Sequence, residues 1–398
     1  MTHKPLEGVK ILDMSRVLAG PYCTMMLSNL GAEIIKVETP KTGDDSRAYT
    51  PLIHGESIYF LSINRGKKSV VINMKSPEGR GIFESIVKQV DVLVENFRPG
   101  TMEKLGYGYE TLKVMNPRLI YTAISGFGHT GPYAGRPAYD MIVQGMGGIM
   151  SITGEPGGNP VRVGTSIGDV VAGMFGAYGT LAALYARNDT GRGQSVDIAM
   201  LDCQVAILEN AIAKTSVLGI APGPLGLKHP SITPFEAYRT QNNWVIVAAG
   251  NDKLFAQFCQ VTDNEQLITD PRFRTNSDRN RNMDELSAFF QQKIKQKTTE
   301  EWLKIFYKQQ IPAGPINTID KLFEDPQIAE RHMILEVDQP HIGKIKISGN
   351  PVKLSDVPAE DENIKEHAPA LGEHTIEILM QYAGYDEEEA VAYTVKYC

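Results

Sequence analysis

The first 200 residues alternate between short apolar runs and longer amphipathic segments. The apolar runs, bounded by glycine or polar turns, read as strands, and the segments between them read as helices. The strand candidates are "GVKILDMS" (8–15), "EIIKVE" (33–38), "KSVVINM" (68–74), "DVLVEN" (91–96), "RLIYTAIS" (118–125) and "GQSVDIAML" (193–201). Helices are expected over 19–32, 76–90 and 109–115. This alternation predicts an α/β fold with right-handed crossovers and a parallel sheet.

The second half of the chain has a different organisation. A long apolar helix starts near residue 169, and "DCQVAILENAIAK" (202–214) predicts another helix. We expect 1–215 to form the first part of a large domain and the loose, proline-rich 216–234 to be a linker. "FEAYRTQNNWVIVAAGN" then suggests a hairpin, and polar amphipathic helices follow it. The segment 235–328 is therefore expected to be a smaller α+β domain.

Composition narrows the functional class. A formal net charge of -7, with both signs spread along the chain, argues against a nucleic-acid-binding surface. The cysteines at 23, 203, 259 and 398 lack metal-ligand or CxxC spacing, which favours reduced thiols in a cytoplasmic protein. The uncharged run 170–186 falls short of the roughly 20 residues that a bilayer span needs. We expect no membrane partner.

Cationic residues follow several of the expected strands. Ligands bind outside the carboxyl ends of strands in open parallel sheets, so Lys75, Arg98, Lys104 and Arg136 could gather on one rim. Such a rim suits a multiply phosphorylated ligand, although scattered, solvated side chains explain the pattern equally well. "SRVLAGP" is not a GxGxxG turn. "RGKKSV" superficially resembles a Walker A loop, but Leu61 stands where the first glycine of that loop should be, and Lys68 stands where Ser or Thr should follow the lysine. No metal-binding cluster and no GxSxG elbow are present in the sequence.

The segment "VGTSIGDVVAGMFGAYGTLAALYARNDTG" (163–191) contains Asp169 near its start. No further charged residue follows until Arg187. An aspartate ahead of an apolar helix is a good N-cap, and this is one interpretation of its position. The other is catalytic: a deprotonated carboxylate in a dry cleft can act as a nucleophile and form an acyl intermediate. The two are compatible, because helix N–H groups and the helix dipole favour the carboxylate form.

Seven segments in order resemble the family III CoA-transferases. They are "PLEGVKILDMSRVLAGPYCTMMLSNLGAEIIKVE", "ENFRPG", "RPAYD", "GDVVAGMFGAYGTLAAL", "TGRGQSVDIAMLD", "IPAGPINTI" and "LGEHT", and they run from Pro5 to about Thr375. The resemblance implies an interlocked homodimer in which each chain threads through its partner. It also implies a Rossmann-like large domain, with a parallel sheet, built from both termini around the inserted small domain. Residues 329–398 would then be a linker and a return to the large domain.

The same resemblance implies a mechanism and a binding site. Asp169 would attack an acyl-CoA, the resulting anhydride would become an aspartyl-CoA thioester, and an acceptor carboxylate would take over the CoA. CoA is a substrate here, and no tightly bound cofactor or metal is expected. CoA would lie along Leu18, Ala19, Ile72, Lys75, Asn96, Phe97, Arg98, Lys104 and Tyr139. Thr39 departs from family members that carry a basic residue at that position.

Two other functions compete with CoA transfer. Racemases of 2-methylacyl-CoA resemble this chain but carry His-Asp where it has Tyr139-Asp140, and His129 in a glycine loop does not replace that imidazole. A non-catalytic acyl-CoA-binding protein would be expected to lack Asp169.

The acceptor is expected to be a small dicarboxylic acid. Oxalate–formate members carry consecutive glycines ahead of the small domain, whereas this chain has only the dispersed Gly219, Gly223 and Gly226, which disfavours formyl-CoA and oxalate. "KHPSITPFEAY" and "VAAGND" look more similar to members that use succinyl-CoA and glutarate. Carnitine-type and aromatic acids remain open.

Overall fold

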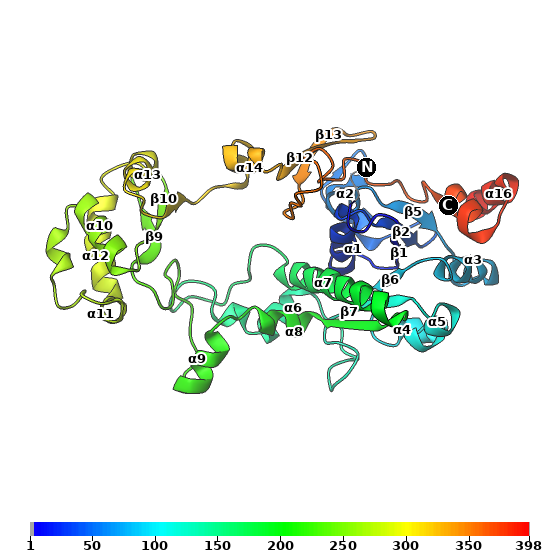
Figure 1. The fold of residues 1–398 in the computed structure, drawn as a ribbon, viewed down its shortest axis with the longest axis horizontal. Coiled ribbons are helices and arrows are strands. Elements are labelled where there is room, and N and C mark those ends of the chain that lie inside the picture. Colours follow the sequence, from blue (N-terminus) through cyan, green and yellow to red (C-terminus); the bar gives the residue numbers. More distant parts are fainter. Residues whose placement is uncertain (1–3, 398) are drawn as a thin grey trace. The chain divides into compact units, whose positions relative to one another are not determined.

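The computed structural model describes residues 4–397, which form two compact units. The first contains 4–150, 162–218 and 326–397, and the second contains 151–161 and 219–325 (Figure 1). The short piece 151–161 was expected in the large domain. Its backbone instead pairs with the segment that the sequence suggested as a linker, since Gly226 N–H donates to the Gly154 carbonyl at 2.8 Å.

A six-stranded, wholly parallel sheet forms the centre of the first unit. Its strand order, β5-β2-β1-β6-β7-β8, is the Rossmann order when the six strands are counted along the chain. The strands are β1 (Lys10–Asp13), β2 (Glu33–Glu38), β5 (Lys68–Val71), β6 (Val92–Glu95), β7 (Ile120–Ser125) and β8 (Ser195–Ala199). The order reverses between β1 and β6, so the ligand crevice of such a sheet is expected there. All six strands come from residues 10–199, and the C-terminal segment contributes helices to this unit.

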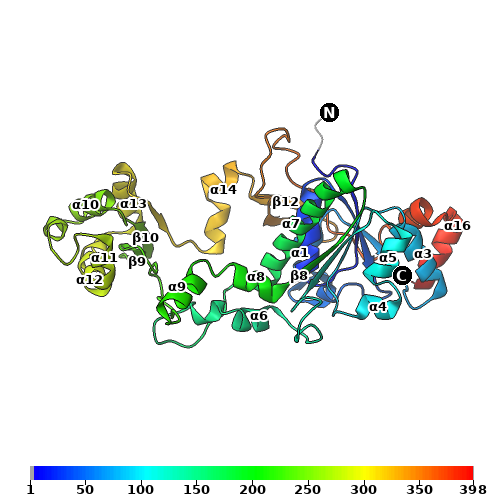
Figure 2. The same cartoon turned by 60° about the horizontal axis from the view of Figure 1, so that its bottom comes forward.

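Helices cover both faces of the sheet, as the alternation of side chains along buried strands requires. Figure 2 shows α1 and α7 on one side of the strands and α3, α4, α5 and α16 on the other. Ile11 packs with the first group and Leu12 with the second. The first face carries α1 (Ala19–Asn29), α6 (Asp140–Met146), α7 (Ile167–Thr190) and α8 (Met200–Ala206). The second carries α3 (Pro77–Val87), α4 (Thr101–Leu105), α5 (Tyr109–Met115), α15 (Thr375–Ile378), the π-helical turn η5 (Leu379–Ala383) and α16 (Glu387–Tyr397).

The glycines of α7 allow it to lie directly against α1. A Cβ at Gly173 would stand 2.7 Å from the Ala19 carbonyl oxygen, and one at Gly176 would stand 2.8 Å from Ile124 on β7. By length and composition α7 is the one helix in residues 4–397 that could cross a membrane, which by itself is weak evidence for a span. Its contacts with α1 and the sheet account for the apolar residues on its inner face.

Smaller elements complete the first unit. They are η1 (Asp45–Ala48), β3 (Leu52–Ile53), β4 (Glu56–Ser57), α2 (Ile58–Asn64), η2 (Ile149–Ser151), α9 (Ala211–Leu218), α14 (Pro326–Glu330), β12 (Ile334–Gln339) and β13 (Gly343–Ser348). The single helix expected over 202–214 was wrong. It is broken between α8 and α9, where Glu209 has a left-handed backbone (φ +49°), a conformation that a continuous α-helix cannot contain.

The second unit is a small α+β domain with its own aromatic core. Its antiparallel sheet has the order β11-β10-β9, and the expected hairpin is formed by β9 and β10. The rings of Phe258 and Phe290 lie 4.3 Å apart between sheet and helices. The elements are β9 (Phe235–Arg239), β10 (Trp244–Ala248), α10 (Asp252–Val261), η3 (Glu265–Ile268), α11 (Asn276–Arg281), α12 (Met283–Ile294), α13 (Thr299–Lys308), β11 (Ala313–Pro315) and η4 (Ile319–Phe323).

Candidate functional site

Two neighbouring cavities lie at the carboxyl ends of the central strands, on either side of the point where the strand order reverses. The first has a volume of about 590 Å³ and the second about 460 Å³. Arg16, Phe97 and Thr101 line both of them, so the two cavities share a wall. Every lining residue belongs to the first unit. This is the location where an open parallel sheet binds its ligands.

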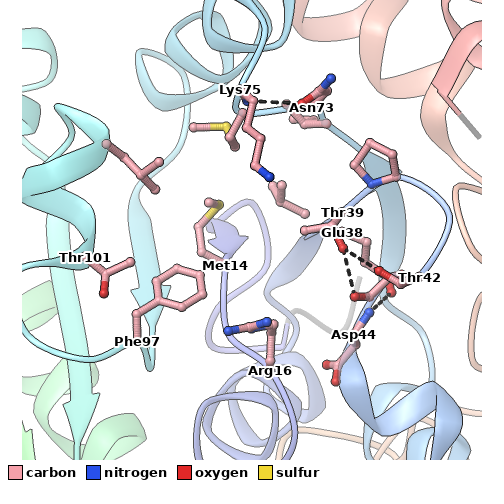
Figure 3. A pocket seen from close by; sticks show the side chains of 16 residues that line it. Met14, Arg16, Glu38, Thr39, Thr42, Asp44, Asn73, Lys75, Phe97 and Thr101 are labelled. Atoms are coloured by element: carbon pink, nitrogen blue, oxygen red, sulfur yellow. Dashed lines mark hydrogen bonds between the residues drawn. The ribbon is translucent and has the colours of Figure 1, made fainter.

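The first cavity combines apolar walls with two cationic side chains (Figure 3). Lys75 and Arg16 both line it, and Figure 3 shows the Lys75 ammonium reaching toward its centre. The apolar walls come from Met14, Val37, Ile72, Met74, Phe97 and Leu105. Such a cavity suits a ligand that carries both a flat apolar group and anionic groups.

The carboxylates beside this cavity are already neutralised by partners. Glu38 accepts two hydrogen bonds from the Arg47 guanidinium, at 2.7 and 2.6 Å. Asp44 pairs with Lys36 at 2.8 Å, and both side chains are fully buried. Arg16 also has an ion pair, with Asp45 at 3.2 Å, but both of these side chains are about half exposed. Arg16 can therefore exchange its partner for a bound anion at little cost, because exposed pairs contribute little stability.

The turn from β1 into α1 is held by side chains from three neighbouring segments. Asn96 binds Arg16 on both sides, accepting its N–H at 2.8 Å and donating to its carbonyl at 2.7 Å. Asp44 accepts the Val17 N–H at 3.0 Å. Lys36 donates to the Ser15 carbonyl at 2.9 Å. Val17 has a φ of +66°, which is strained for a β-branched residue, so these bonds maintain a conformation that the turn would otherwise leave.

Asp169 is the third residue of α7 and lines the second cavity. The interpretation of Asp169 as an N-cap was wrong: Ser166 holds the N-cap position, and the Ser166 side chain makes no capping hydrogen bond. Within residues 4–397 no group hydrogen-bonds to the Asp169 carboxylate. The neighbouring Gly168 N–H is taken instead by the Asp140 carboxylate, at 2.8 Å.

The environment of Asp169 favours the protonated acid more than the sequence suggested. Burial raises the pKa of Asp169 to about 7, and the nearby Asp140 carboxylate adds to the rise. The expectation that the helix start favours ionisation was therefore wrong, since removal of water and a like charge outweigh the dipole. Tyr59 on α2 lies near the same carboxylate: burial, and then the charge of Asp169, raise the pKa of Tyr59 to about 12. A carboxyl group with a shifted pKa in a cleft is typical of a functional site.

Most of the residues predicted to bind the ligand line these two cavities. The second cavity contains Asp169 together with Leu18, Ala19, Asn96, Phe97, Arg98, Arg136 and Tyr139. Ile72 and Lys75 line the first cavity. Lys104 lines neither: it lies exposed on α4, while Thr101 and Leu105 of that helix line the first cavity. Of the four cations expected on one rim, two line the second cavity and one lines the first.

Within residues 4–397 no group of three His, Cys, Asp or Glu side chains could hold a metal ion.

Comparison with known proteins agrees with this geometry. The model of "CoA-transferase family III" matches residues 6–375. The chain belongs to this family. It is 42% identical to the acetyl-CoA:oxalate CoA-transferase of Acetobacter aceti, over 95% of this chain and 96% of the relative. It is 39% identical to the succinyl-CoA:glutarate CoA-transferase of Homo sapiens, over 96% of this chain and 87% of the relative.

A solved structure has the same fold along nearly the whole chain. A CAIB/BAIF family protein from Brucella suis superposes with a TM-score of 0.84 at 37% identity, over 96% of this chain and 100% of that one. The chain is thus a family III CoA-transferase, an enzyme whose substrates are CoA thioesters and carboxylic acids.

Three residues near the site were not identified as site residues from the sequence of this family III enzyme. Arg16 lies three residues after the end of β1, and its place beyond a strand's carboxyl end was the available signal. Tyr59 is on α2, a helix that the sequence patterns did not predict. Asp140 was noted only beside Tyr139, and its contact with Gly168 joins positions 28 residues apart in the chain. No local pattern could have indicated that contact.

Proposed function

We propose that this enzyme transfers CoA from an acyl-CoA to a small dicarboxylic acid, with Asp169 as the nucleophile. The observation that carries the proposal is the state of the Asp169 carboxylate. It is half-buried, has no hydrogen-bond partner within residues 4–397, and lines a cavity that adjoins a cationic one. A carboxylate without donors keeps its electron pairs available, which is what a nucleophile needs.

The proposed reaction proceeds through exchange of acyl groups on Asp169. A carboxylate oxygen attacks the thioester carbonyl, the carbon–sulfur bond breaks, and CoA leaves as the thiolate. The thiolate then attacks the aspartyl carbonyl of the mixed anhydride, forms an aspartyl-CoA thioester and releases the donor acid. The acceptor carboxylate attacks this thioester, giving a second anhydride and CoA thiolate. Attack of the thiolate on the acceptor carbonyl forms the new acyl-CoA and restores the Asp169 carboxylate.

This series of reaction steps consumes no water and no ATP, because each step exchanges one activated carboxyl derivative for another. Water is its main hazard, since it would hydrolyse the anhydride or the aspartyl thioester. The burial that raises the pKa of Asp169 also limits the access of water to the intermediates formed there.

We further propose that CoA binds across both cavities. The apolar walls and Lys75 of the first cavity suit the adenine and phosphate groups, and the second cavity would hold the thioester beside Asp169. Leu18, Ala19 and Asn96 would line the path between them, with Arg98 and Arg136 at its edge. Lys104, exposed on α4, would contact a group of CoA that extends outside the cavities.

The proposal of a small dicarboxylate as acceptor is supported by the names of the relatives. Oxalate and glutarate are both dicarboxylic acids, and they appear in the names of relatives at 42% and 39% identity. The lack of consecutive glycines no longer weighs against oxalate, because an oxalate-named relative is as similar to this chain as the glutarate-named one. Both acids, and the donors acetyl-CoA and succinyl-CoA, belong in the test.

The racemase alternative receives no support from His129. This residue is absent from the residues lining the cavity of Asp169, and its Nε2 lies 3.8 Å from Glu95 instead.

We also propose that the enzyme is a homodimer working in the cytoplasm. Large apolar side chains are exposed on α7 and α9 of the first unit, namely Tyr178, Tyr185, Val217 and Leu218. A partner subunit would cover such a surface. The three described cysteines are free thiols, as expected in a reducing compartment. Gel filtration with light scattering should give twice the chain mass; a monomer that is fully active would contradict the dimer.

The test offers acyl-CoA donors and acids to the wild-type enzyme and to Asp169→Asn, and follows thioester exchange by mass spectrometry. The wild type should exchange CoA between at least one donor and a dicarboxylate, and the variant should lose about 10⁴-fold or more in rate. Exchange retained in the variant would overturn the role of Asp169. Fast deuterium exchange at C2 of a 2-methylacyl-CoA, without transfer, would favour the racemase.

A further inference from the structure

The start of α7 is fixed by a contact with α6. The Asp140 carboxylate, on the first residue of α6, accepts the Gly168 N–H through Oδ1 at 2.8 Å. Its other oxygen, Oδ2, accepts a hydrogen bond from Gln144 Nε2 at 2.8 Å. Gln144 Oε1 in turn accepts the Val163 N–H at 2.9 Å. Two side chains of α6 thus hold both the first turn of α7 and the segment that leads into it.

The approach of the two helices at this point depends on glycine. A Cβ at Gly168 would lie 2.7 Å from a Val143 methyl group and 3.0 Å from Asp140 Oδ1. Because Gly168 has no side chain, the Asp140 carboxylate can reach the Gly168 backbone. Asp140 therefore contacts the residue that directly precedes Asp169. Asp140 and Gln144 are both buried, so water does not compete for these hydrogen bonds.

We infer that Asp140 is a positioning residue for Asp169: it fixes the first turn of α7 through the Gly168 N–H and so determines where the Asp169 carboxylate meets the thioester. This inference rests on the proposed function, because it requires Asp169 to be the nucleophile. Asp140 does not itself form or break a bond in the reaction. A nucleophile must lie about 3 to 3.5 Å from the carbonyl carbon, and a misplacement of about 1 Å can cost a hundredfold in rate.

The contact also places a like charge near Asp169. The charged and titratable groups around Asp169 are Asp140 on α6, Tyr59 on α2, and the ionisable side chains that line the same cavity, namely Arg16, Asp45, Arg98, Arg136 and Tyr139. The Asp140 charge contributes to raising the pKa of Asp169, whereas Tyr59 is neutral near pH 7. Asp140 therefore influences both the position and the protonation of Asp169, and the two effects can be separated by substitution.

Two variants of Asp140 separate them. Asp140→Asn keeps an oxygen for the Gly168 N–H and removes the charge, although its NH2 group replaces the oxygen that accepts from Gln144 Nε2. Because the contact with α7 remains, most of kcat should remain at high pH. The midpoint of the acidic limb of the pH–rate profile should move down by about one pH unit. Asp140→Ala removes the acceptor as well, and kcat should fall by about a hundredfold while KM for the acyl-CoA changes little.

Asp91 provides the matched control. It binds the opposite end of α7, where its carboxylate pairs with Arg187 at 2.9 Å and also accepts the Lys10 N–H. Asp91→Asn and Asp91→Ala should lower the melting temperature without moving the pH midpoint or reducing kcat. If Asp140→Ala does not fold, Asp140→Asn still carries the test through its pH profile.

Either of two results would overturn the inference: wild-type kcat in a folded Asp140→Ala enzyme, or an unmoved pH midpoint in Asp140→Asn. Both would leave the proposed function intact as long as Asp169→Asn remains inactive. If Asp169→Asn were active, the proposed function itself would fail. The effects of the Asp140 substitutions would then give no information on how the nucleophile is positioned.

Discussion

Asp169 combines two properties that rarely coincide on one side chain. It is at the start of a helix, where the dipole favours a negative charge, yet burial and Asp140 raise its pKa to about 7. A partly desolvated carboxylate is more reactive than a fully solvated one, but at neutral pH only part of the Asp169 population is ionised. The rate should therefore depend on pH in a range where most aspartates are fully charged.

The first prediction concerns this dependence. In the proposed mechanism only the ionised form of Asp169 attacks, so kcat/KM should rise with pH, reach half its maximum near pH 7 and level off above about pH 8. The measurement is the initial rate of thioester exchange at low acyl-CoA concentration between about pH 5 and 9.

Glu95 is the control for this profile, because burial raises its pKa to about 7 as well. Its carboxylate accepts the Phe97 N–H at 2.7 Å and does not line the cavity of Asp169. Glu95→Gln should leave the midpoint near pH 7, whatever it does to KM. A midpoint that moves with Glu95 and not with Asp140 would show that Glu95 is the group being titrated.

The second prediction concerns Arg16, which lies in the wall between the two cavities and stacks over the Phe97 ring at 5.3 Å. Arg16→Ala should raise KM for the acyl-CoA about tenfold with kcat nearly unchanged, because a charge-assisted bond to phosphate is lost. Asp45→Asn should lower KM, since it frees Arg16 from its exposed ion pair.

A dephospho-CoA thioester identifies the phosphate involved. If Arg16 binds the 3′-phosphate, Arg16→Ala should have no effect on this substrate; if it binds the diphosphate, the tenfold effect should persist. Arg118→Ala is the matched control, because Arg118 lies at the amino-terminal edge of β7, at the other end of the strands. An equal rise in KM for Arg118→Ala would refute a specific role for Arg16.

Among the secondary-structure elements, α1 and α7 determine the geometry of the site. Leu18 and Ala19 begin α1, Asp169 begins α7, and the two helices lie against each other on one face of the sheet (Figure 2). Their close approach is possible because Gly173 faces the Ala19 carbonyl. The glycine content of α7, unfavourable for an isolated helix, is thus explained by packing.

The third prediction tests this packing. A Cβ at Gly173 would lie 2.7 Å from backbone, which cannot yield as a side-chain tip can, so Gly173→Ala should destabilise the enzyme by about 1 to 3 kcal/mol. Gly81→Ala in α3 is the control, because a Cβ there meets nothing within 4 Å. It should stabilise by up to about 1 kcal/mol through helix propensity. Chemical denaturation measures both; equal effects would contradict the packing argument.

Across the chain, local sequence patterns predicted the elements whose formation depends on nearby residues. The six strands were predictable because each is a buried apolar run between turn residues, and the β9–β10 hairpin for the same reason. Gathering of site residues at the strand ends followed from the parallel topology. The break at Glu209 and helix α2 were not predictable, because neither carries a strong periodic signal.

The electrostatic environment of Asp169 also could not be predicted from the sequence. The contact between Asp140 and Gly168 and the raised pKa of Asp169 arise where α6 meets α7, from groups far apart in the chain. The placement of 151–161 in the second unit likewise depends on pairing with 226, a distant segment. The family resemblance implied the role that we propose for Asp169, but it gave no information on this electrostatic environment.

The central claim is that Asp169 becomes covalently acylated, and one tryptic peptide tests it directly. Cleavage after Arg162 and Arg187 releases 163–187, in which Asp169 is the sole side-chain carboxyl group. The enzyme is mixed with acyl-CoA, quenched with hydroxylamine during turnover and digested. The account predicts a hydroxamate mass on this peptide in the wild type and none in Asp169→Asn. Steady CoA transfer with an unmodified 163–187 peptide, or with the hydroxamate on another peptide, would contradict it.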